Sequence, residues 1–381
     1  MLKILHVVTS FGMGGAERVA FSLATELARH HDVLVVGIFG VQPAYETIRQ
    51  ENLRLLAAGG VKTIEIGLRG KGPQMLGALA RLGRAIRNFG PHIVHSHTDI
   101  PDFFVSLVRR AMPFTQARTI HNTVLWPGRT IIPRMVEGRF RDDLVVCVGE
   151  GAKVAYLALR ARLGLPASNF VDVVPNGIVP PEESDLRAKA QAETILGLAP
   201  DRLRLGFVGR MDRQKGLDLL LDAVERLEGG ARQIEVHVIG DGPERNALEA
   251  RAAGLPVRFH GARADARRLM AAFDLMIVPS RYEGFPTVAL EARMAGVPTL
   301  MSDAPGICDV PTTHEMLRVP AEDPAALTHA LRLCLEKLPE LNAGAEAQIS
   351  AAQQAYSAAR MARDYEALYG TYLARDSGAR P

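Results

Sequence analysis

Short runs of β-branched and aliphatic residues alternate along the chain with longer segments of helical periodicity. This alternation is typical of parallel sheets whose strands are joined by helical crossovers, so it predicts an α/β fold. The composition, with 48% apolar and 23% charged residues, excludes collagen, coiled-coil and low-complexity proteins. In the first half the predicted strands are Ile4–Val8, Val33–Ile38, Thr63–Ile66, Ile93–His95, Arg118–His121, Leu144–Val148 and Val171–Val174.

A second series of the same kind follows the segment Val174–Pro181, where three prolines stand among turn residues. Neither a helix nor a central strand tolerates such a segment, so it marks a domain boundary. The strands predicted after it are Leu203–Val208, Glu235–Ile239, Val257–His260, Leu275–Val278 and Pro298–Met301. The helices predicted between and after them are Leu217–Leu227, Glu244–Ala253, Ala264–Ala272, Thr287–Ala295 and Ala325–Lys337.

The length of 381 residues fits two domains, because single hydrophobic cores stop growing near about 250–300 residues. We predict an N-terminal domain over 1–175, a C-terminal domain over 176–350, and a helical segment over 351–381 that packs back on the N-terminal domain. An alanine-rich pattern predicts a single helix from about Ala351 to Leu373. Two doubly wound domains facing each other bring the carboxyl ends of both sheets to one interdomain cleft, so functional residues are expected in loops after strands.

The composition bears on the cellular location of the protein and on the chemistry of its cysteines. No apolar run approaches the roughly 18–20 residues that span a bilayer, and the N-terminus lacks a signal-peptide pattern, so we expect a cytoplasmic protein. The cysteines Cys147, Cys308 and Cys334 are odd in number and lack CxxC spacing. They therefore support neither a disulfide framework nor a thiolate metal site.

Positive charge is concentrated in the first half of the chain. Residues 1–180 hold 21 basic and 13 acidic residues, an excess of +8, whereas residues 181–381 hold 24 and 29, or −5. Few aromatic residues lie among the arginines, which favours an anionic membrane surface over nucleic acid as a partner. Ordinary solvated helix faces would give the same pattern, so both interpretations stay open. The arginines concerned are Arg81, Arg84, Arg87, Arg109, Arg110, Arg129, Arg134, Arg139 and Arg141.

The loop Ser10–Glu17 follows the first strand and opens a helix near Ala16. Its glycines let backbone N–H groups approach an anion at the positive end of that helix. Gly12 and Gly14 also satisfy the start of a dinucleotide fingerprint, but Glu17 stands where the third glycine belongs, and no acidic residue ends the second strand. An anion site is therefore favoured over NAD, with a simple tight turn as the alternative.

Two further loops carry charged residues after predicted strands. In Gly206–Gly216, Arg210 and Lys215 lie at a helix start, where a cation opposes the helix dipole unless an anion binds there. This conflict indicates a bound phosphate, although both side chains could simply point into water.

In the loop after Leu275–Val278, Pro286 suits the first position of a helix. Glu283 then lies in the loop and can meet a sugar, whereas Glu291 lies in the helix and can accept hydrogen bonds from ribose hydroxyls, unless both are ordinary surface carboxylates.

Together these motifs resemble the signature set of glycosyltransferase family 4, whose fold is GT-B: two Rossmann-like, doubly wound parallel-sheet domains. The resemblance spans nearly the whole chain. It rests on Gly14-Gly15 with Glu17, Pro175-Asn176-Gly177, Gly209-Arg210 with Lys215-Gly216, Gly240-Asp-Gly242-Pro, and Glu283-Gly-Phe-Pro with Glu291. The sequence departs from the family at Pro286, where glycine is frequent, and at Val179, where aspartate commonly follows Asn-Gly-Ile.

The resemblance implies which residues act. Arg210 and Lys215 would hold the diphosphate with help from the Gly15 N–H, Glu283 would meet the donor sugar, and His121 matches a histidine near that sugar. These four side chains, His121, Arg210, Lys215 and Glu283, are the expected catalytic set. The expected donor-binding set is Gly14, Gly15, Gly209, Gly240, Gly242, Gly284, Phe285, Pro286, Thr287 and Glu291.

The sequence suggests no resident metal or cofactor. His95-Ser-His97-Thr-Asp99 resembles half of a metallohydrolase site, but Ile100 stands where a further histidine is expected, so packing or lining a cleft fits these histidines better. The sequence contains no Asp-x-Asp motif to hold a divalent ion on the diphosphate. Arg210 and Lys215 would therefore supply the positive charge for the departing phosphate.

By resemblance, the protein is expected to be a retaining hexosyltransferase of cell-envelope polysaccharide biosynthesis. A UDP-sugar is favoured as the donor over a GDP-sugar, and the acceptor would be a lipid-linked, lipopolysaccharide or other glycan at the inner face of the membrane. A GT-B nucleotide-sugar epimerase and a catalytically silent sugar-nucleotide-binding protein are the alternatives.

Overall fold

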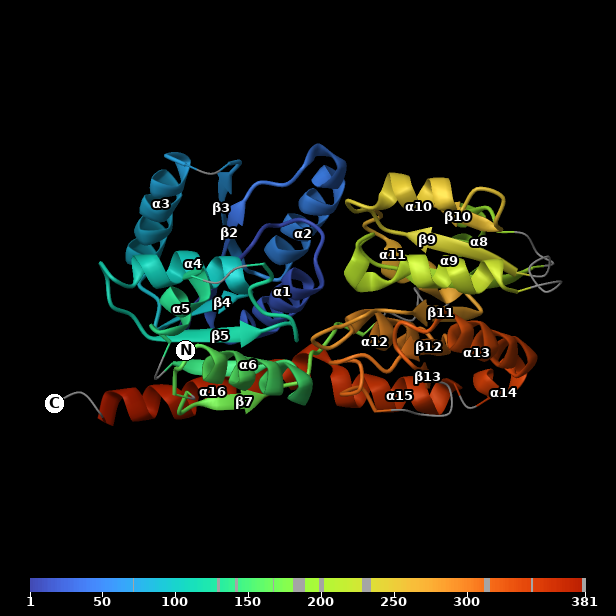
Figure 1. Cartoon of the computed structure of the whole chain (residues 1–381). Coiled ribbons are helices and arrows are strands. Elements are labelled where there is room, and N and C mark those ends of the chain that lie inside the picture. The colour runs from blue at the N-terminus through green and yellow to red at the C-terminus, as the bar shows by residue number, and fades with distance from the viewer. Residues whose placement is uncertain are drawn as a thin grey trace. The chain divides into compact units, whose positions relative to one another are not determined.

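The computed structural model describes residues 1–70, 72–128, 131–140, 143–166, 168–180, 189–198, 202–227, 234–311, 316–343 and 345–378. Pro181, Arg129 and Arg141, which the sequence analysis singled out, lie outside these residues. The chain divides into two compact units (Figure 1). Unit 1 comprises Met1–Val179 and Ala358–Pro381, and unit 2 comprises Pro180–Ser357.

Unit 1 is built on a parallel sheet of order β3-β2-β1-β4-β5-β6-β7. The strands are β1 Lys3–Val8, β2 Asp32–Phe39, β3 Lys62–Leu68, β4 Ile93–His97, β5 Gln116–Ile120, β6 Leu144–Cys147 and β7 Val171–Val173. Because β1 lies between β2 and β4, the strand order reverses direction there, as it does in doubly wound folds.

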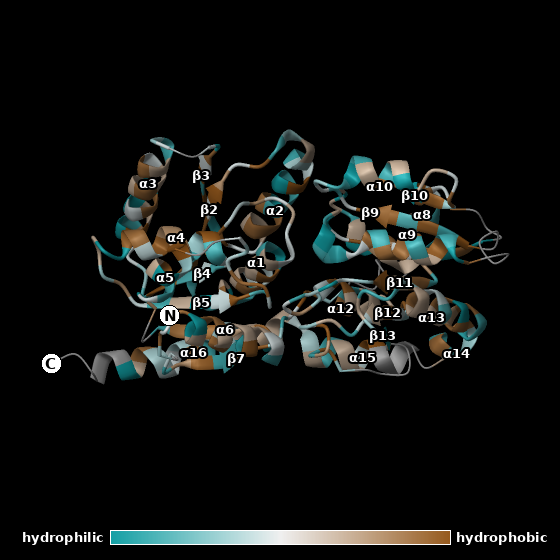
Figure 2. Ribbon diagram, in the orientation of Figure 1, coloured by the Kyte–Doolittle hydropathy of each residue, from teal (hydrophilic) through white to brown (hydrophobic). Residues whose placement is uncertain are grey.

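Helices cover both faces of this sheet and bury two separate apolar clusters. One cluster joins β1 and β2 to the helices α1 and α16, and the other joins them to α3 and α4. Figure 2 shows hydrophobic and hydrophilic residues alternating along helices such as α3, whose inner face packs on the sheet. The helices of unit 1 are α1 Gly15–Leu27, α2 Glu46–Ala58, α3 Gln74–Phe89, α4 Asp99–Val108, α5 Ile131–Glu137, α6 Glu150–Arg162 and α16 Ala358–Gly378.

Unit 2 repeats the arrangement with the order β10-β9-β8-β11-β12-β13, again entirely parallel. Its strands are β8 Leu203–Val208, β9 Ile234–Ile239, β10 Val257–Phe259, β11 Leu275–Val278, β12 Thr299–Ser302 and β13 Met316–Val319. Its helices are α8 Lys189–Leu196, α9 Leu217–Glu225, α10 Arg245–Arg251, α11 Ala266–Leu269, α12 Thr287–Met294, α13 Pro324–Glu336, α14 Leu338–Asn342 and α15 Ala345–Tyr356.

The predicted strands are confirmed in both units, with ends that differ by at most two residues. The prediction that His121 ends a strand is wrong, because β5 stops at Ile120 and leaves His121 in the following loop. Sequence analysis missed β13, a four-residue strand that pairs with β12 and places Arg318 opposite Met301. A charged residue in so short a run hides the strand pattern.

The helix predicted from Ala351 to Leu373 is wrong as a single element. The structure has α15 and α16 instead, interrupted at Ser357. At the interruption the Ala358 N–H donates to the Ile178 carbonyl at 2.8 Å, a long-range bond that replaces the local helical one. Beyond it, α16 packs on α1 within unit 1 and buries Met361, Tyr365 and Tyr369.

The segment around Pro175 belongs to unit 1, because α16 holds it. Besides the Ile178 bond, the Arg360 guanidinium donates to the Pro175 carbonyl at 2.6 Å, and the Gly177 N–H lies 3.1 Å from the Met361 sulfur. The compact units therefore divide at Val179 and Ser357, whereas the sequence analysis placed the divisions after residues 175 and 350.

Candidate functional site

In each unit, several residues that the sequence analysis singled out lie at the ends of strands where the strand order reverses. In unit 2, Arg210 follows β8 and Glu283 follows β11, its neighbour across that point. In unit 1, Gly14 follows β1, and His97 ends β4, its neighbour there. The carboxyl ends of strands at such a reversal are where doubly wound sheets bind ligands, so both sets occupy a suitable edge.

Arg210 and Lys215 are carried by a turn whose ends are fixed by Asp212. The Asp212 carboxylate accepts a hydrogen bond from the Lys215 backbone N–H at 3.2 Å and pairs with the Arg210 guanidinium at 2.5 Å. Gly216 follows with φ of 68°, a left-handed conformation that favours glycine, and a Cβ there would lie 2.1 Å from the Pro279 carbonyl oxygen. The turn therefore sets both cations at the start of α9.

The loop after β9 packs against this turn through backbone contacts. A Cβ on Gly240 would lie 1.8 Å from the carbonyl oxygen of Gly209, and one on Gly242 would lie 2.3 Å from that of Met211. The Met211 N–H donates to the Asp241 carbonyl at 2.9 Å. Gly240 and Gly242 thus allow two loops to touch backbone to backbone, which fixes the position of Arg210.

Glu283 forms the other half of the site in unit 2. Its carboxylate pairs with the Lys215 ammonium at 2.6 Å, accepts from the Ser280 hydroxyl at 2.8 Å, and lies 3.4 Å from the Gln214 amide. Gly306 supports the Glu283 backbone so closely that a Cβ would lie 2.1 Å from the Glu283 carbonyl oxygen. The motifs after β8 and β11, far apart in sequence, therefore meet through one buried carboxylate and one cation.

The residues after Glu283 are mostly buried. Gly284 and Pro286 are buried, and the Phe285 ring lies 5.9 Å from that of Tyr356. Pro286 is extended and precedes the helix rather than occupying its first position, because α12 begins at Thr287. Glu291 is the fifth residue of α12 and is 7% exposed, so it is not an ordinary surface carboxylate.

In unit 1, Gly14 caps α1 and Gly15 is its first residue. A Cβ on Gly14 would lie 1.9 Å from a carboxylate oxygen of Glu17, so the glycine makes room for that side chain at the helix start. This arrangement places Gly14 and Gly15 at the helix start, as the sequence predicted.

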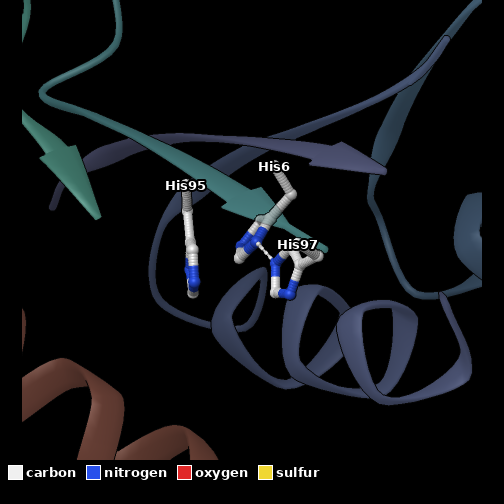
Figure 3. A group of neighbouring side chains, drawn as sticks. All are labelled: His6, His95 and His97. Carbon is white, nitrogen blue, oxygen red and sulfur yellow. Dashed lines mark hydrogen bonds between the residues drawn. The ribbon is translucent and has the colours of Figure 1, made fainter. Parts of the chain in front are cut away.

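Four histidines from three neighbouring segments gather beside this loop. His6 lies on β1, His95 and His97 lie on β4, and His121 follows β5. Figure 3 shows the rings of His6, His95 and His97 side by side, with the His6–His97 hydrogen bond drawn. His6 Nδ1 lies 3.0 Å from His97 Nε2, and His97 Nδ1 lies 3.0 Å from His121 Nε2. The sequence analysis singled out His95, His97 and His121 but missed His6, whose strand shows only an apolar pattern.

The ring nitrogens of His6, His95 and His97 come within 4.8 Å of one another, which raises the question of a metal ion. Both His95 nitrogens are already bonded to hydroxyls, Nδ1 to Tyr369 at 2.6 Å and Nε2 to Thr119 at 2.7 Å. The rings of His95 and His97 stack with centroids 4.2 Å apart, whereas metal ligands must point their in-plane lone pairs at one centre. The donor set therefore fits hydrogen-bonded imidazoles better than a metal.

Burial keeps these imidazoles neutral. It lowers the pKa of His6 and of His121 to about 3, because desolvation disfavours the charged ring. The pKa values of His95 and His97 are also lowered by burial, and further by the neighbouring histidines. His121 can therefore act as a neutral hydrogen-bonding group at physiological pH.

Comparisons with known proteins show which proteins this chain is similar to. The model of the family described as "Glycosyltransferase Family 4" matches residues 13–180, and that described as "Glycosyl transferases group 1" matches residues 202–337. A putative glycosyltransferase EpsF of Bacillus subtilis is 27% identical over 79% of each chain. A 2-deoxystreptamine N-acetyl-D-glucosaminyltransferase of Streptomyces fradiae is 33% identical over 64% of this chain and 62% of its own.

Solved structures show the fold. A structure of Anabaena HepE in complex with UDP and glucose, 18% identical, covers 97% of this chain and 100% of its own with a TM-score of 0.80. A sucrose-phosphate synthase of Thermosynechococcus elongatus, 19% identical, covers 98% and 100% with a TM-score of 0.75. Two parallel-sheet α/β units of this kind define the GT-B class of fold.

The chain belongs to glycosyltransferase family 4, since the two family models together match most of its length. It is therefore a glycosyltransferase. Among the residues that the structure describes, no helix is long and apolar enough to cross a membrane.

Proposed function

We propose that the protein is a retaining hexosyltransferase that uses a nucleotide-diphosphate sugar, with a UDP-sugar favoured over a GDP-sugar. One observation carries the proposal: Arg210 and Lys215 lie with the buried Glu283 carboxylate at the strand-order reversal of unit 2. HepE, which has the same fold, has been solved with UDP and with UDP-glucose, which supports the choice of donor.

In this proposal Lys215 and Arg210 neutralise the diphosphate as the bond to the sugar breaks. A lysine ammonium has three N–H donors, so Lys215 can keep its bond to Glu283 and still donate to a phosphate oxygen. Glu283 thereby orients Lys215, and its loop presents backbone groups of Gly284 and Phe285 to the sugar. Glu291 holds the ribose. This division assigns charge neutralisation to the cations and binding to Glu291.

For retention we propose attack on the same face from which the phosphate leaves, with that phosphate taking the proton of the acceptor. A covalent intermediate would need a free carboxylate as nucleophile, and Glu283 is instead bonded to Lys215 and Ser280. His121, as a neutral ring, supplies a hydrogen bond to the donor sugar in this scheme.

We expect donor binding to raise the melting temperature, and to do so equally with EDTA present, because fixed cations bind the diphosphate in place of a metal ion. A ligand at 100 times its Kd stabilises by about 2.7 kcal/mol, which a thermal-shift panel of UDP-, GDP- and ADP-sugars resolves. Sugar transfer measured in EDTA should be unchanged as well. Loss of binding or transfer in EDTA contradicts metal independence, and conversion of a free UDP-sugar to its epimer contradicts transfer.

The acceptor that we propose is a lipid-linked, lipopolysaccharide or other glycan of cell-envelope polysaccharide biosynthesis, at an anionic membrane surface. Two relatives support this class by their printed names: a putative teichuronic acid biosynthesis glycosyltransferase TuaC, and a lipopolysaccharide core biosynthesis mannosyltransferase LpsB. The chain covers 61% and 56% of these relatives. Within unit 1, Arg81, Arg84 and Arg87 are exposed on α3, and Leu76 on the same helix is 72% exposed.

We expect reversal of charge at Arg81, Arg84 and Arg87 to weaken pelleting with phosphatidylserine vesicles by at least about 10²-fold. Each arginine near an anionic surface contributes about 1 kcal/mol, and this contribution is screened by salt. The control is a triple reversal at three exposed arginines of unit 2, Arg226, Arg251 and Arg332. Equal pelleting of the α3 variant and the wild-type protein would rule out membrane binding through this helix.

A further inference from the structure

Three of the four clustered histidines form a continuous chain of ring-to-ring hydrogen bonds. His6 Nδ1 lies 3.0 Å from His97 Nε2, and His97 Nδ1 lies 3.0 Å from His121 Nε2. The rings of each pair have centroids 5.2 Å apart. We call His6, His97 and His121 the imidazole relay. His95 stands outside it, because both of its nitrogens bond to the hydroxyls of Thr119 and Tyr369.

The relay runs from the interior of unit 1 toward its surface. His6 is fully buried and His97 is 2% exposed, whereas His121, at the carboxyl end of β5, is half-buried. Among the described residues the two end atoms, His6 Nε2 and His121 Nδ1, are buried and have no hydrogen-bond partner. Desolvation lowers the pKa of both end rings to about 3, so each ring of the relay carries one proton at neutral pH.

A neutral imidazole has one N–H and one bare nitrogen, so each ring in such a chain donates once and accepts once. If His121 carries its proton on Nδ1, its Nε2 must accept from His97 Nδ1, and His97 Nε2 must accept from His6 Nδ1. If His121 carries its proton on Nε2, both bonds reverse. All three rings therefore share one tautomer, and a ring that differed would place two N–H groups or two lone pairs face to face.

We propose that His97, supported by His6, is a positioning residue that fixes the tautomer and orientation of His121 in the site. This inference rests on the proposed function, in which the His121 ring bonds to the donor sugar. His121 Nε2 is occupied by His97, so Nδ1 is the nitrogen that remains for the sugar. The relay thus decides whether that atom donates or accepts, and it does so without bringing a charge into the buried cluster.

The tautomers can be observed directly by NMR on full-length protein labelled with ¹⁵N-histidine, since protonated and bare ring nitrogens have well-separated shifts. At pH 7 we expect His6, His97 and His121 to show the same tautomer, all Nδ1–H or all Nε2–H. The assignment uses the single variants His6→Phe, His97→Phe and His121→Phe. Opposite tautomers within the relay, or a relay ring that titrates near pH 6.5 as an exposed histidine would, overturns the proposal.

Activity gives a second readout. His97→Phe removes the partner of His121, and we expect kcat/KM to fall about tenfold, the equivalent of one lost hydrogen bond. In His97→Asn the side-chain amide stands near the former Nδ1 position, so most of the loss should be recovered. In a His121→Ala background His97→Phe should cost nothing further, because it acts only through His121. Full additivity of the two losses contradicts the proposal.

The matched control is Tyr369→Phe, which removes a hydroxyl from the same buried cluster without touching the relay. We expect it to lower the melting temperature while leaving the His121 tautomer and kcat/KM unchanged. A change in either would mean that the cluster acts only through general packing. The two failures remain separable: wild-type protein that transfers no sugar refutes the proposed function, whereas the tautomers test the relay without reference to activity.

Discussion

Replacing Lys215 by alanine is expected to lower kcat by about 10²–10³ at saturating donor. Removal of one preorganised group that stabilises developing charge typically costs about 3–4 kcal/mol of transition-state stabilisation. Lys215 is such a group in our proposal, because Asp212 fixes its backbone and Glu283 fixes its ammonium at 2.6 Å. Initial rates of sugar transfer over a range of donor concentrations measure the effect.

Two variants accompany this measurement. Arg213→Ala removes an exposed cation two residues away, and we expect kcat to stay within about twofold of the wild-type value. Glu291→Ala should show its defect mainly as a raised KM, because Glu291 contacts the ribose equally before and during the reaction. Equal kcat losses for Lys215→Ala and Glu291→Ala at saturating donor would contradict the proposed division of roles.

Replacing Glu137 by alanine is expected to destabilise unit 1 by about 3–5 kcal/mol, since it breaks a buried ion pair and leaves Arg118 with one fewer acidic partner. The Arg118 guanidinium, 1% exposed, donates to Glu137 at 2.8 Å and pairs with Asp102 as well. The Glu137 carboxylate also accepts from the Trp126 indole at 3.0 Å. The chain has one tryptophan, so urea unfolding followed by its fluorescence reports on unit 1 alone.

The control for this variant is Lys62→Ala, which removes an exposed partner of Asp32. Surface ion pairs contribute little, so its unfolding midpoint should match that of the wild-type protein. Glu137→Gln keeps an acceptor for Trp126 but loses the charge, and its midpoint should fall between the other two. A Glu137→Ala midpoint no lower than that of Lys62→Ala would show that the buried pair contributes nothing to stability.

Local patterns predicted most of the fold. The strands that lead into the site, β1, β4, β8 and β11, each contain a short run of aliphatic residues, so the local sequence pattern was sufficient to predict them. Two of the features that were missed or wrong depend on distant partners instead. β13 is recognised through its pairing with β12, and the break at Ser357 through the bond between Ala358 and Ile178.

The sequence by itself determined the α/β class, the positions of the loops after the strands and the residue types in them, because periodicity and turn chemistry are local properties. The glycosyltransferase family also follows from motifs that the chain carries in order. Only the tertiary structure decided that Lys215 pairs with Glu283 and that His6 joins His97 and His121. These partners are 24 to 91 residues apart, and no local pattern encodes which strands become neighbours. The strand order of each sheet therefore brings site residues together that lie far apart in the sequence.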